Sequence, residues 1–269
     1  KIIYKYFSML NNLVSIITPS FNSSQFIIRA IESVLSQTYK EWELIIVDDG
    51  SEDNSVESIE NFIKNKEQIY LIKLNKNIGV ANARNEALKI TKGRYIAFLD
   101  SDDLWLPNKL EKQLKFMKSN NYSFIFSAYD KIDEQGNVFG HIGVHDRVSY
   151  CDLLKTNSIG CLTALYDTDY FGKIYMPTNT KREDFATWLQ LLKRVEYAYG
   201  LNETLAQYRV YASQSSTNKI NMATENWHLY RQIEGLNLLK ASYYFSHYGV
   251  KGLLRTKAPG LAKILGILK

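Results

Sequence analysis

Three carboxylates stand within four positions, at Asp100, Asp102 and Asp103, directly after the mostly apolar segment 94–99. A short apolar run bounded by polar residues is typical of a buried strand, and open α/β sheets bind ligands at the carboxyl ends of such strands. Clustered carboxylates repel one another unless a positive charge shares the site. Because Mg²⁺ and Mn²⁺ prefer oxygen ligands and often bridge to substrate phosphates, the cluster predicts a divalent-cation site. The alternative is a solvent-exposed acidic turn that caps the helix expected from Pro107.

Carboxylates also occur at two other places that suggest chemistry. Asp48 and Asp49 follow the apolar run 42–47, and a carboxylate such as Asp49 can accept a hydrogen bond from the N–H of a uracil base. Glu183 and Asp184 open a segment with helical spacing, where the helix dipole stabilises an anion. Asp184 is therefore either an ordinary helix N-terminal carboxylate or a general base, which must be ionised and within reach of a hydroxyl.

Two more residues have properties suited to a nucleotide site. Arg84 can donate hydrogen bonds to a base carbonyl or to a phosphate, and Gly79 lets the backbone approach a ligand closely. No Gly-x-Gly-x-x-Gly follows the first apolar run at 13–18, which argues against a dinucleotide fold, and no Walker-type Gly-Lys-Ser/Thr is present. These residues therefore predict a nucleotide site formed by carboxylates and Arg84.

The elements that must position these residues alternate in type. Apolar runs at 13–18, 42–47, 69–74 and 94–99 are separated by three segments of helical spacing. This rhythm predicts βαβ units and an α/β fold with a mostly parallel sheet. Since the carboxyl ends of parallel strands meet at one edge, we expect the polar groups that follow the four runs to converge. These groups are Pro19 to Asn22, Asp48 and Asp49, Asn77 to Gly79, and Asp100 to Asp103.

The remaining chain is less regular. Residues 22–24 offer side-chain N-caps for a helix over about 25–37. Strands are expected near 122–129, 138–144, 162–166 and 206–210, and helices over 107–119, from Glu183 onward, and through most of 222–257.

Composition limits the environment and the partners. Two cysteines in 269 residues make no disulfide framework, which indicates a reducing, cytosolic setting. The net charge is +5, yet no acidic residue follows Glu234, and six Lys or Arg residues do. A nucleic-acid surface would need basic residues spread over a folded face, so no nucleic-acid partner is expected. A basic, apolar, Tyr-rich C-terminal tail instead favours contact with an anionic membrane surface.

Several motifs together resemble the family 2 inverting glycosyltransferases of the GT-A fold. They are Val14-Ser15-Ile16-Ile17-Thr18-Pro19-Ser20-Phe21-Asn22, Val47-Asp48-Asp49-Gly50-Ser51, Asn77-Ile78-Gly79 with Ala83-Arg84-Asn85, and Phe98-Leu99-Asp100-Ser101-Asp102-Asp103. Glu183-Asp184 and Tyr208-Arg209 resemble later landmarks of the family. The segment 208–254 is similar to bacterial surface-polysaccharide transferases of the teichuronic-acid and O-antigen type.

The resemblance implies an architecture. We expect a GT-A type fold with a Rossmann-like, mostly parallel central sheet flanked by helices, and a helical C-terminal extension. The glycosyltransferase domain would span residues 1–215, with a nucleotide-binding half at 13–110 and an acceptor-binding half at 111–215. A basic helical extension would follow at 216–269.

The resemblance also implies roles for individual residues. Asp100 would contact the ribose or share a cation, Asp102 would hold Mn²⁺ or Mg²⁺ on the diphosphate, and Asp184 would deprotonate the acceptor hydroxyl. The residues expected to bind the nucleotide sugar are Pro19, Phe21, Asn22, Asp48, Asp49, Gly79, Arg84, Asp100, Glu183 and Arg209.

The implied reaction is the transfer of a hexose, glucose or galactose, from a UDP-sugar to a lipid-linked sugar such as GlcNAc-diphospho-undecaprenol. The product would be a β-linkage made during O-antigen or capsular polysaccharide synthesis. The protein would lie on the cytoplasmic face of the bacterial inner membrane, held peripherally by its C-terminal tail.

One position departs from the family, and two other functions stay open. Relatives often carry His two residues after the Tyr-Arg pair, where this chain has Tyr211, so a third protein ligand to the metal is in doubt. An Asp-x-Asp phosphatase with Asp100 as nucleophile would want a hydroxyl where Leu104 stands. A non-catalytic nucleotide-sugar-binding protein would bind UDP without turnover.

Overall fold

The computed structural model describes residues 12–211, 219–257 and 260. Its strands are β1 (Val14–Ser20), β2 (Trp42–Asp48), β3 (Ile69–Lys73), β4 (Tyr95–Phe98), β5 (Leu104–Trp105), β6 (Phe124–Ile132), β7 (Val138–Ile142), β8 (Arg147–Val148), β9 (Leu165–Asp167) and β10 (Ala198–Arg209). Within this part of the chain they form one ten-stranded sheet in the order β3-β2-β1-β4-β9-β6-β10-β5, with β7 beside β6 and β8 beside β10.

The sheet is mostly parallel, as predicted. β1 pairs in parallel with β2 and β4, β2 pairs in parallel with β3, and β6 pairs in parallel with β10. β9 lies between β4 and β6 and runs antiparallel to both. The strands β1 to β4 therefore end at one edge, which brings their C-terminal loops together.

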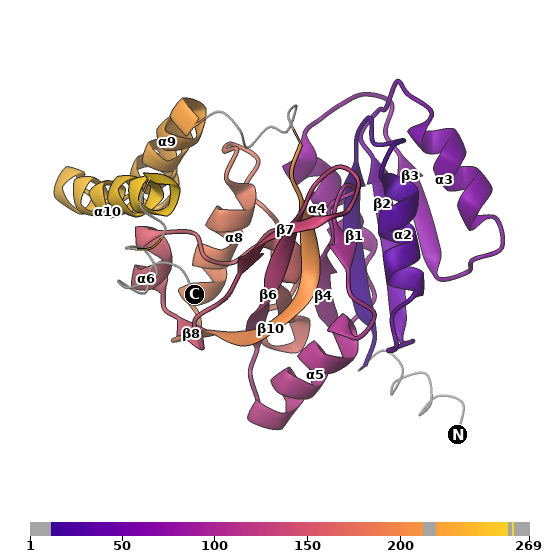
Figure 1. Ribbon diagram of the computed structural model, residues 1–269, viewed down its shortest axis with the longest axis horizontal. Coiled ribbons are helices and arrows are strands. Elements are labelled where there is room, and N and C mark those ends of the chain that lie inside the picture. Colours follow the sequence, from indigo (N-terminus) through magenta and orange to yellow (C-terminus); the bar gives the residue numbers. More distant parts are fainter. Residues whose placement is uncertain (1–11, 212–218, 258–259, 261–269) are drawn as a thin grey trace.

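Helices cover both faces of the sheet (Figure 1). They are α2 (Ile27–Leu35), α3 (Ser55–Ile63), α4 (Val80–Ile90), α5 (Lys109–Asn120), α6 (Tyr150–Lys155), α7 (Thr168–Phe171), α8 (Glu183–Leu192), α9 (Lys219–His228) and α10 (Leu238–Lys257), with a 3-10 turn at Cys161–Thr163 and a π-helical turn at Leu229–Ile233. Alternate strand residues face opposite layers: Ile16 joins the core with α2, α3 and α5, whereas Ile17 joins the core with α4 and α8. Burial on both faces explains why these strands read as continuous apolar runs.

Three sequence expectations need correction. The predicted side-chain N-cap of α2 from residues 22–24 is wrong: the helix begins after Phe26 without a side-chain cap, because the Asn22 side chain instead accepts the amide of Glu52. The strand expected at 162–166 is split into the 3-10 turn and β9. The strand expected at 206–210 is the end of the longer β10, which begins at Ala198. Register shifts between Leu201 and Ala206 interrupt the alternating pattern of β10, so its first part could not be recognised from the sequence.

The C-terminal helices pack against α6 and α8 (Figure 1). The buried Tyr230 hydroxyl donates to the Leu154 carbonyl at 2.6 Å, and the carboxylate of Glu234 accepts from Lys193 at 2.8 Å and from the Tyr150 hydroxyl. The predicted boundary at 215 falls among residues 212–218, and most of the predicted tail after Pro259 also lies outside the described residues. Among the described helices, none combines the length and the apolar character needed to span a bilayer.

Lys109, the first residue of α5, is a lysine buried in the apolar layer. Its side chain is fully buried, its Nζ donates to Gln113 Oε1 at 2.6 Å, and it lies 3.9 Å from the centroid of the Trp105 ring. Burial without a carboxylate partner lowers the pKa of Lys109 to about 7. The folded protein therefore holds this lysine largely neutral above neutral pH.

The pH dependence of stability tests this placement. Between pH 7 and 10.5 the unfolded chain binds one proton more at Lys109 than the folded chain does, so the free energy of unfolding rises with pH, by up to about 1.4 kcal/mol per pH unit. Lys109→Met removes this rise, while Lys89→Met, at an exposed pair with Glu86, keeps it. Urea unfolding from pH 7 to 9.5 measures the slopes, and parallel profiles for wild type and Lys109→Met would contradict the assignment.

Candidate active site

The loops after β1, β2 and β3 are tied together by hydrogen bonds, as predicted from the parallel rhythm. The Asn22 amide donates to the Ser51 hydroxyl at 2.9 Å. The two Asp49 carboxylate oxygens accept the amides of Ile78 at 2.8 Å and Gly79 at 2.9 Å. The C-terminal ends of three neighbouring strands thus form one rigid rim.

The residues expected around the nucleoside all lie in this rim. Pro19 is buried within β1, and the Phe21 ring at its end is 45 % exposed. Asp48 is buried and accepts from the amide and hydroxyl of Ser51, at 2.9 and 2.6 Å. Asp48 and Asp49 therefore shape the loops, and a hydrogen bond from Asp49 to a base would use the oxygens' remaining lone pairs.

The conformation of this rim requires glycine at one position. Gly50 has φ +75°, and a Cβ there would lie 2.6 Å from the carbonyl carbon of Lys76. Only a residue without a side chain allows the two loops to pass so closely.

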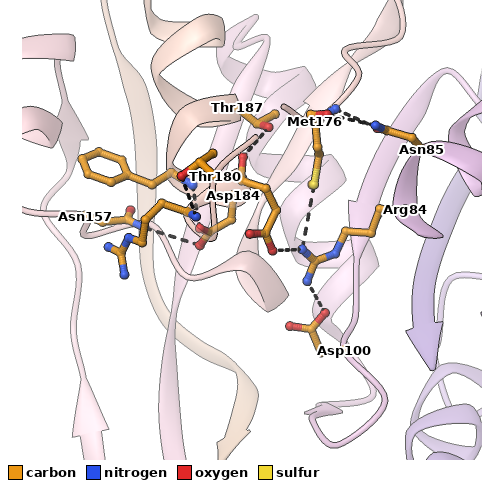
Figure 2. Close-up of polar contacts among 11 residues, drawn as sticks. Arg84, Asn85, Asp100, Asn157, Met176, Thr180, Asp184 and Thr187 are labelled. Carbon is orange, nitrogen blue, oxygen red and sulfur yellow. Dashed lines mark hydrogen bonds and ion pairs between the residues drawn. The ribbon is translucent and has the colours of Figure 1, made fainter. Parts of the chain in front are cut away.

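Arg84 bridges the acidic loop after β4 and the start of α8 (Figure 2). Its guanidinium contacts Asp100 at 2.5 Å and Glu183 at 2.8 Å, and the Met176 sulfur lies 3.8 Å from Nη1. The Arg84 side chain is 4 % exposed. The two carboxylates raise the pKa of Arg84 further above its usual value despite the opposing effect of burial. Contact of Arg84 with a base or diphosphate stays a prediction, and its buried Nε has no hydrogen-bond partner among the described residues.

Asp100 and Asp102 do not point at the same partner, although they are two residues apart. Asp100 faces Arg84, whereas Asp102 Oδ2 accepts from the Tyr211 hydroxyl at 2.9 Å. Burial, and then the charge of Asp100, raise the pKa of Asp102. Tyr211 therefore stands against the expected metal ligand, at the position where relatives often carry His.

Asp103 and Arg209 fix the backbone of the acidic loop. Asp103 is buried, its Oδ1 accepts the Arg209 amide at 2.9 Å, and its Oδ2 has no hydrogen-bond partner. The Arg209 Nε donates to the Asp102 carbonyl at 2.8 Å, and its Nη1 donates to the carbonyls of Asp133 and Glu134. The guanidinium expected at the substrate is thus engaged with backbone carbonyls beneath the loop.

Asp184 lies in the N-terminal turn of α8, next to Glu183, and few hydrogen bonds hold its side chain (Figure 2). Its Oδ1 accepts its neighbour's amide at 2.6 Å, and its Oδ2 is 3.4 Å from Asn157 Nδ2. Asn157 comes from the loop 156–162, which sequence reasoning did not single out. A carboxylate without a cationic partner of its own is suited to accept a proton from a hydroxyl.

A cleft of about 1910 Å³ is lined by Arg84, Asp100, Glu183 and Asp184. Other lining residues come from 78–82, 139–145, 156–162, α9 and α10, whereas Asp49 and Asp102 are not among them. Typical small-molecule pockets are about 300–1,000 Å³. The cleft therefore has room for a substrate larger than one nucleotide sugar.

The acidic loop fits a divalent cation shared with a substrate. Within the described residues no three His, Cys, Asp or Glu side chains are placed to enclose a metal on their own. Yet the Asp103 Oδ2 is an unpartnered buried oxygen, and Asp100 and Asp102 repel each other. Mg²⁺ and Mn²⁺ commonly bind through one or two carboxylates together with substrate phosphates, and this donor set meets that requirement.

Sequence reasoning missed the residues that hold the loop before α8. The Asn85 side chain donates to the Met176 carbonyl at 2.9 Å and accepts the Met176 amide at 2.8 Å (Figure 2). Asn85 adjoins Arg84 in α4, so one turn of this helix fixes both the loop and the ion pairs. The sequence shows that Arg84 and Asn85 are adjacent. It does not show that they bind Glu183 and Met176, which lie 99 and 91 residues further along the chain.

Comparisons with known proteins agree with this geometry. The model of the family described as Glycosyl transferase family 2 matches residues 15–173. TuaG of Bacillus subtilis (strain 168), named for a teichuronic acid biosynthesis glycosyltransferase, is 44 % identical over 237 residues, covering 88 % of this chain and 94 % of TuaG. The Escherichia coli UDP-Glc:alpha-D-GlcNAc-diphosphoundecaprenol beta-1,3-glucosyltransferase WfgD is 37 % identical over 242 residues, covering 90 % and 94 %.

A solved structure supports the fold. The chain superposes on Staphylococcus aureus TarS 1–349 in complex with UDP-GlcNAc with a TM-score of 0.71 at 20 % identity, covering 92 % of this chain and 75 % of that one. The predicted GT-A type fold is thereby confirmed. The comparisons favour a transferase over the phosphatase and the non-catalytic binding protein that the carboxylates alone left open. The chain belongs to glycosyl transferase family 2 and is a glycosyltransferase.

Proposed function

We propose that the enzyme transfers a hexose, glucose or galactose, from its UDP form to GlcNAc-diphospho-undecaprenol or a similar lipid-linked sugar. The product is a β-linkage in O-antigen or capsular polysaccharide synthesis. The observation that carries the proposal is that Arg84 joins Asp100 of the nucleotide-binding half to Glu183, directly beside Asp184, in one cleft. The names of TuaG and WfgD support a surface polysaccharide and the lipid-diphosphate acceptor.

The reaction is a single displacement. The acceptor hydroxyl oxygen forms a bond to the anomeric carbon while the bond from that carbon to the UDP oxygen breaks, and UDP leaves with the electron pair. The hydroxyl proton passes to the carboxylate of Asp184, which acts as general base. Attack on the face opposite UDP inverts an α-linked donor sugar to a β-linked product.

The donor lies along the rim of the nucleotide-binding half. Pro19, Phe21, Asn22 and Asp49 surround the base and ribose, and Gly79 leaves room for the backbone to approach. Asp102, with Asp100 beside it, would hold Mn²⁺ or Mg²⁺. A bound cation neutralises the charge that develops on the departing diphosphate.

A peripheral membrane position on the cytoplasmic face belongs to the same proposal. Its support is the outer stripe of α10, which we define as Leu239, Tyr243 and Val250. These side chains are 83, 53 and 56 % exposed, and their spacing of four and seven residues places them on one helix face. Exposed Lys240 adjoins the stripe, as expected for a helix that lies on anionic lipid.

Activity of carboxylate variants tests the catalytic roles. Asp184→Asn is expected to lose about 100- to 10,000-fold in kcat, because it lacks the proton acceptor, while retaining the affinity for UDP. Asp102→Ala is expected to lose both activity and the Mn²⁺ dependence of UDP binding. Asp169→Asn, an exposed carboxylate of α7, is the matched control.

The assay uses a panel of UDP-hexoses with Mn²⁺ and a GlcNAc-diphosphate lipid, with products detected by mass spectrometry and linkage read by NMR. An α-linked product, absence of product with every UDP-hexose, or near-wild-type rates for Asp184→Asn would each contradict the proposal.

Vesicle binding tests the membrane position separately. Leu239→Glu with Val250→Glu is expected to weaken sedimentation with anionic phosphatidylglycerol vesicles at low salt by at least about 10-fold, since each buried apolar side chain contributes about 1.5 kcal/mol or more. Ile90→Glu, which changes an exposed apolar residue of α4, should bind as the wild type does. Equal binding of all three proteins would show that the outer stripe does not contact lipid.

A further inference from the structure

Arg182 is a cation in the cleft that has no carboxylate partner within the described residues. It is the N-cap residue of α8, two positions before Asp184, and it lines the cleft. No ion pair involving Arg182 occurs in the described part of the chain, whereas Arg84 and Arg94 are each paired with two acids. An arginine head group supplies five donors, so the Arg182 guanidinium has donors to spare.

Its surroundings hold the guanidinium at the side of α8 that faces the C-terminal helices. The Cζ lies 5.5 Å from the Phe185 ring centroid, and Nη1 is 3.9 Å from the Met222 sulfur of α9. The Nε is buried and has no hydrogen-bond partner. Aromatic and thioether contacts fix the position of the cation without neutralising it.

Two nearby acids are already engaged. Glu183 pairs with Arg84, and Glu225 of α9 accepts the backbone amide of Lys181 at 3.1 Å. Arg182 itself lines the cleft, so a ligand there that supplies acceptor oxygens could reach the donors of its guanidinium.

The position of Arg182 separates it from the donor end. The acidic loop, where the UDP diphosphate is expected, reaches α8 through Arg84 and Glu183. Among the described residues, the Arg182 guanidinium contacts Met222 of α9 and not the acidic loop. An anion at Arg182 would therefore belong to the acceptor, because Arg182 stands two residues before the proposed base Asp184.

We propose that Arg182 binds the diphosphate of the acceptor, and that it sets the preference for a sugar-diphosphate over a neutral sugar. The inference rests on the proposed function, because it names the subsite for that acceptor. A planar guanidinium donates two parallel hydrogen bonds to phosphate oxygens, which fixes the orientation of the acceptor sugar over Asp184.

Kinetics with two acceptors test the proposal. One is GlcNAc-α-diphosphate with an alkyl chain, and the other is the GlcNAc alkyl glycoside without phosphate. Arg182→Gln is expected to raise KM for the diphosphate acceptor by about 10- to 100-fold, with the KM for the neutral acceptor as in the wild type. Arg182→Lys should recover part of the loss. Arg147→Gln, at another arginine that lines the cleft, is the matched control.

Binding without turnover distinguishes this inference from the proposed function. Calorimetry with inorganic diphosphate at saturating UDP should show binding to the wild type that Arg182→Gln loses, and an unchanged Kd for UDP. Such binding in a protein that transfers no sugar would support the anion subsite and reject the acceptor identity. Equal KM increases for both acceptors, equal diphosphate binding by wild type and variant, or a loss confined to Arg147→Gln would overturn the inference.

Discussion

The position of one buried cation determines the arrangement of this site. Arg84 is 4 % exposed and contacts two carboxylates that are 83 residues apart in the chain, Asp100 and Glu183. Taking three charges out of water is unfavourable unless their geometry is good, and removing one partner of a buried pair typically costs about 3–5 kcal/mol. Arg84 therefore fixes the position of the loop after β4 relative to the first turn of α8. The groups proposed for the donor and for the acceptor are held together by this constraint.

Further hydrogen bonds hold the loops around Arg84 in place. Asp49 holds the turn at Ile78 and Gly79, Arg209 holds the backbone of the acidic loop, and Asn85 holds Met176. A transferase gains most from charges and dipoles that are oriented before reaction, because they need no reorganisation as the leaving group departs. The side chains of Arg84 and Tyr211 hold Asp100 and Asp102, while the backbone of their loop is held by Arg209.

The sequence predicted the parts of the structure that depend on local pattern. Continuous apolar runs in β1 and β2 indicated strands buried on both faces, and their alternation with helices predicted the parallel sheet and the common rim. The ion pairs of Arg84 could not be predicted, since Glu183 lies 99 residues away and its register with α4 depends on tertiary packing. The N-cap of α2 failed for a similar reason: Asn22 bonds to the loop after β2 rather than to its own helix. Motif resemblance pointed to Asp102 and to the departure at Tyr211, but not to the hydrogen bond between them.

Three consecutive residues at the start of α8 divide the work in this account. Glu183 anchors the helix to Arg84, and we propose that Asp184 accepts the proton and that Arg182 binds the acceptor. Because one helix turn carries all three, a shift of α8 would move the proposed base and the proposed acceptor subsite together, relative to the acidic loop.

A crystal structure with UDP and Mn²⁺, with the ion located by anomalous scattering, tests the central claim most directly. The account predicts a manganese peak beside Asp102, Arg84 still between Asp100 and Glu183, and Asp184 facing the space next to the diphosphate. A manganese peak remote from Asp102, or an Asp184 carboxylate turned out of the cleft, would contradict it.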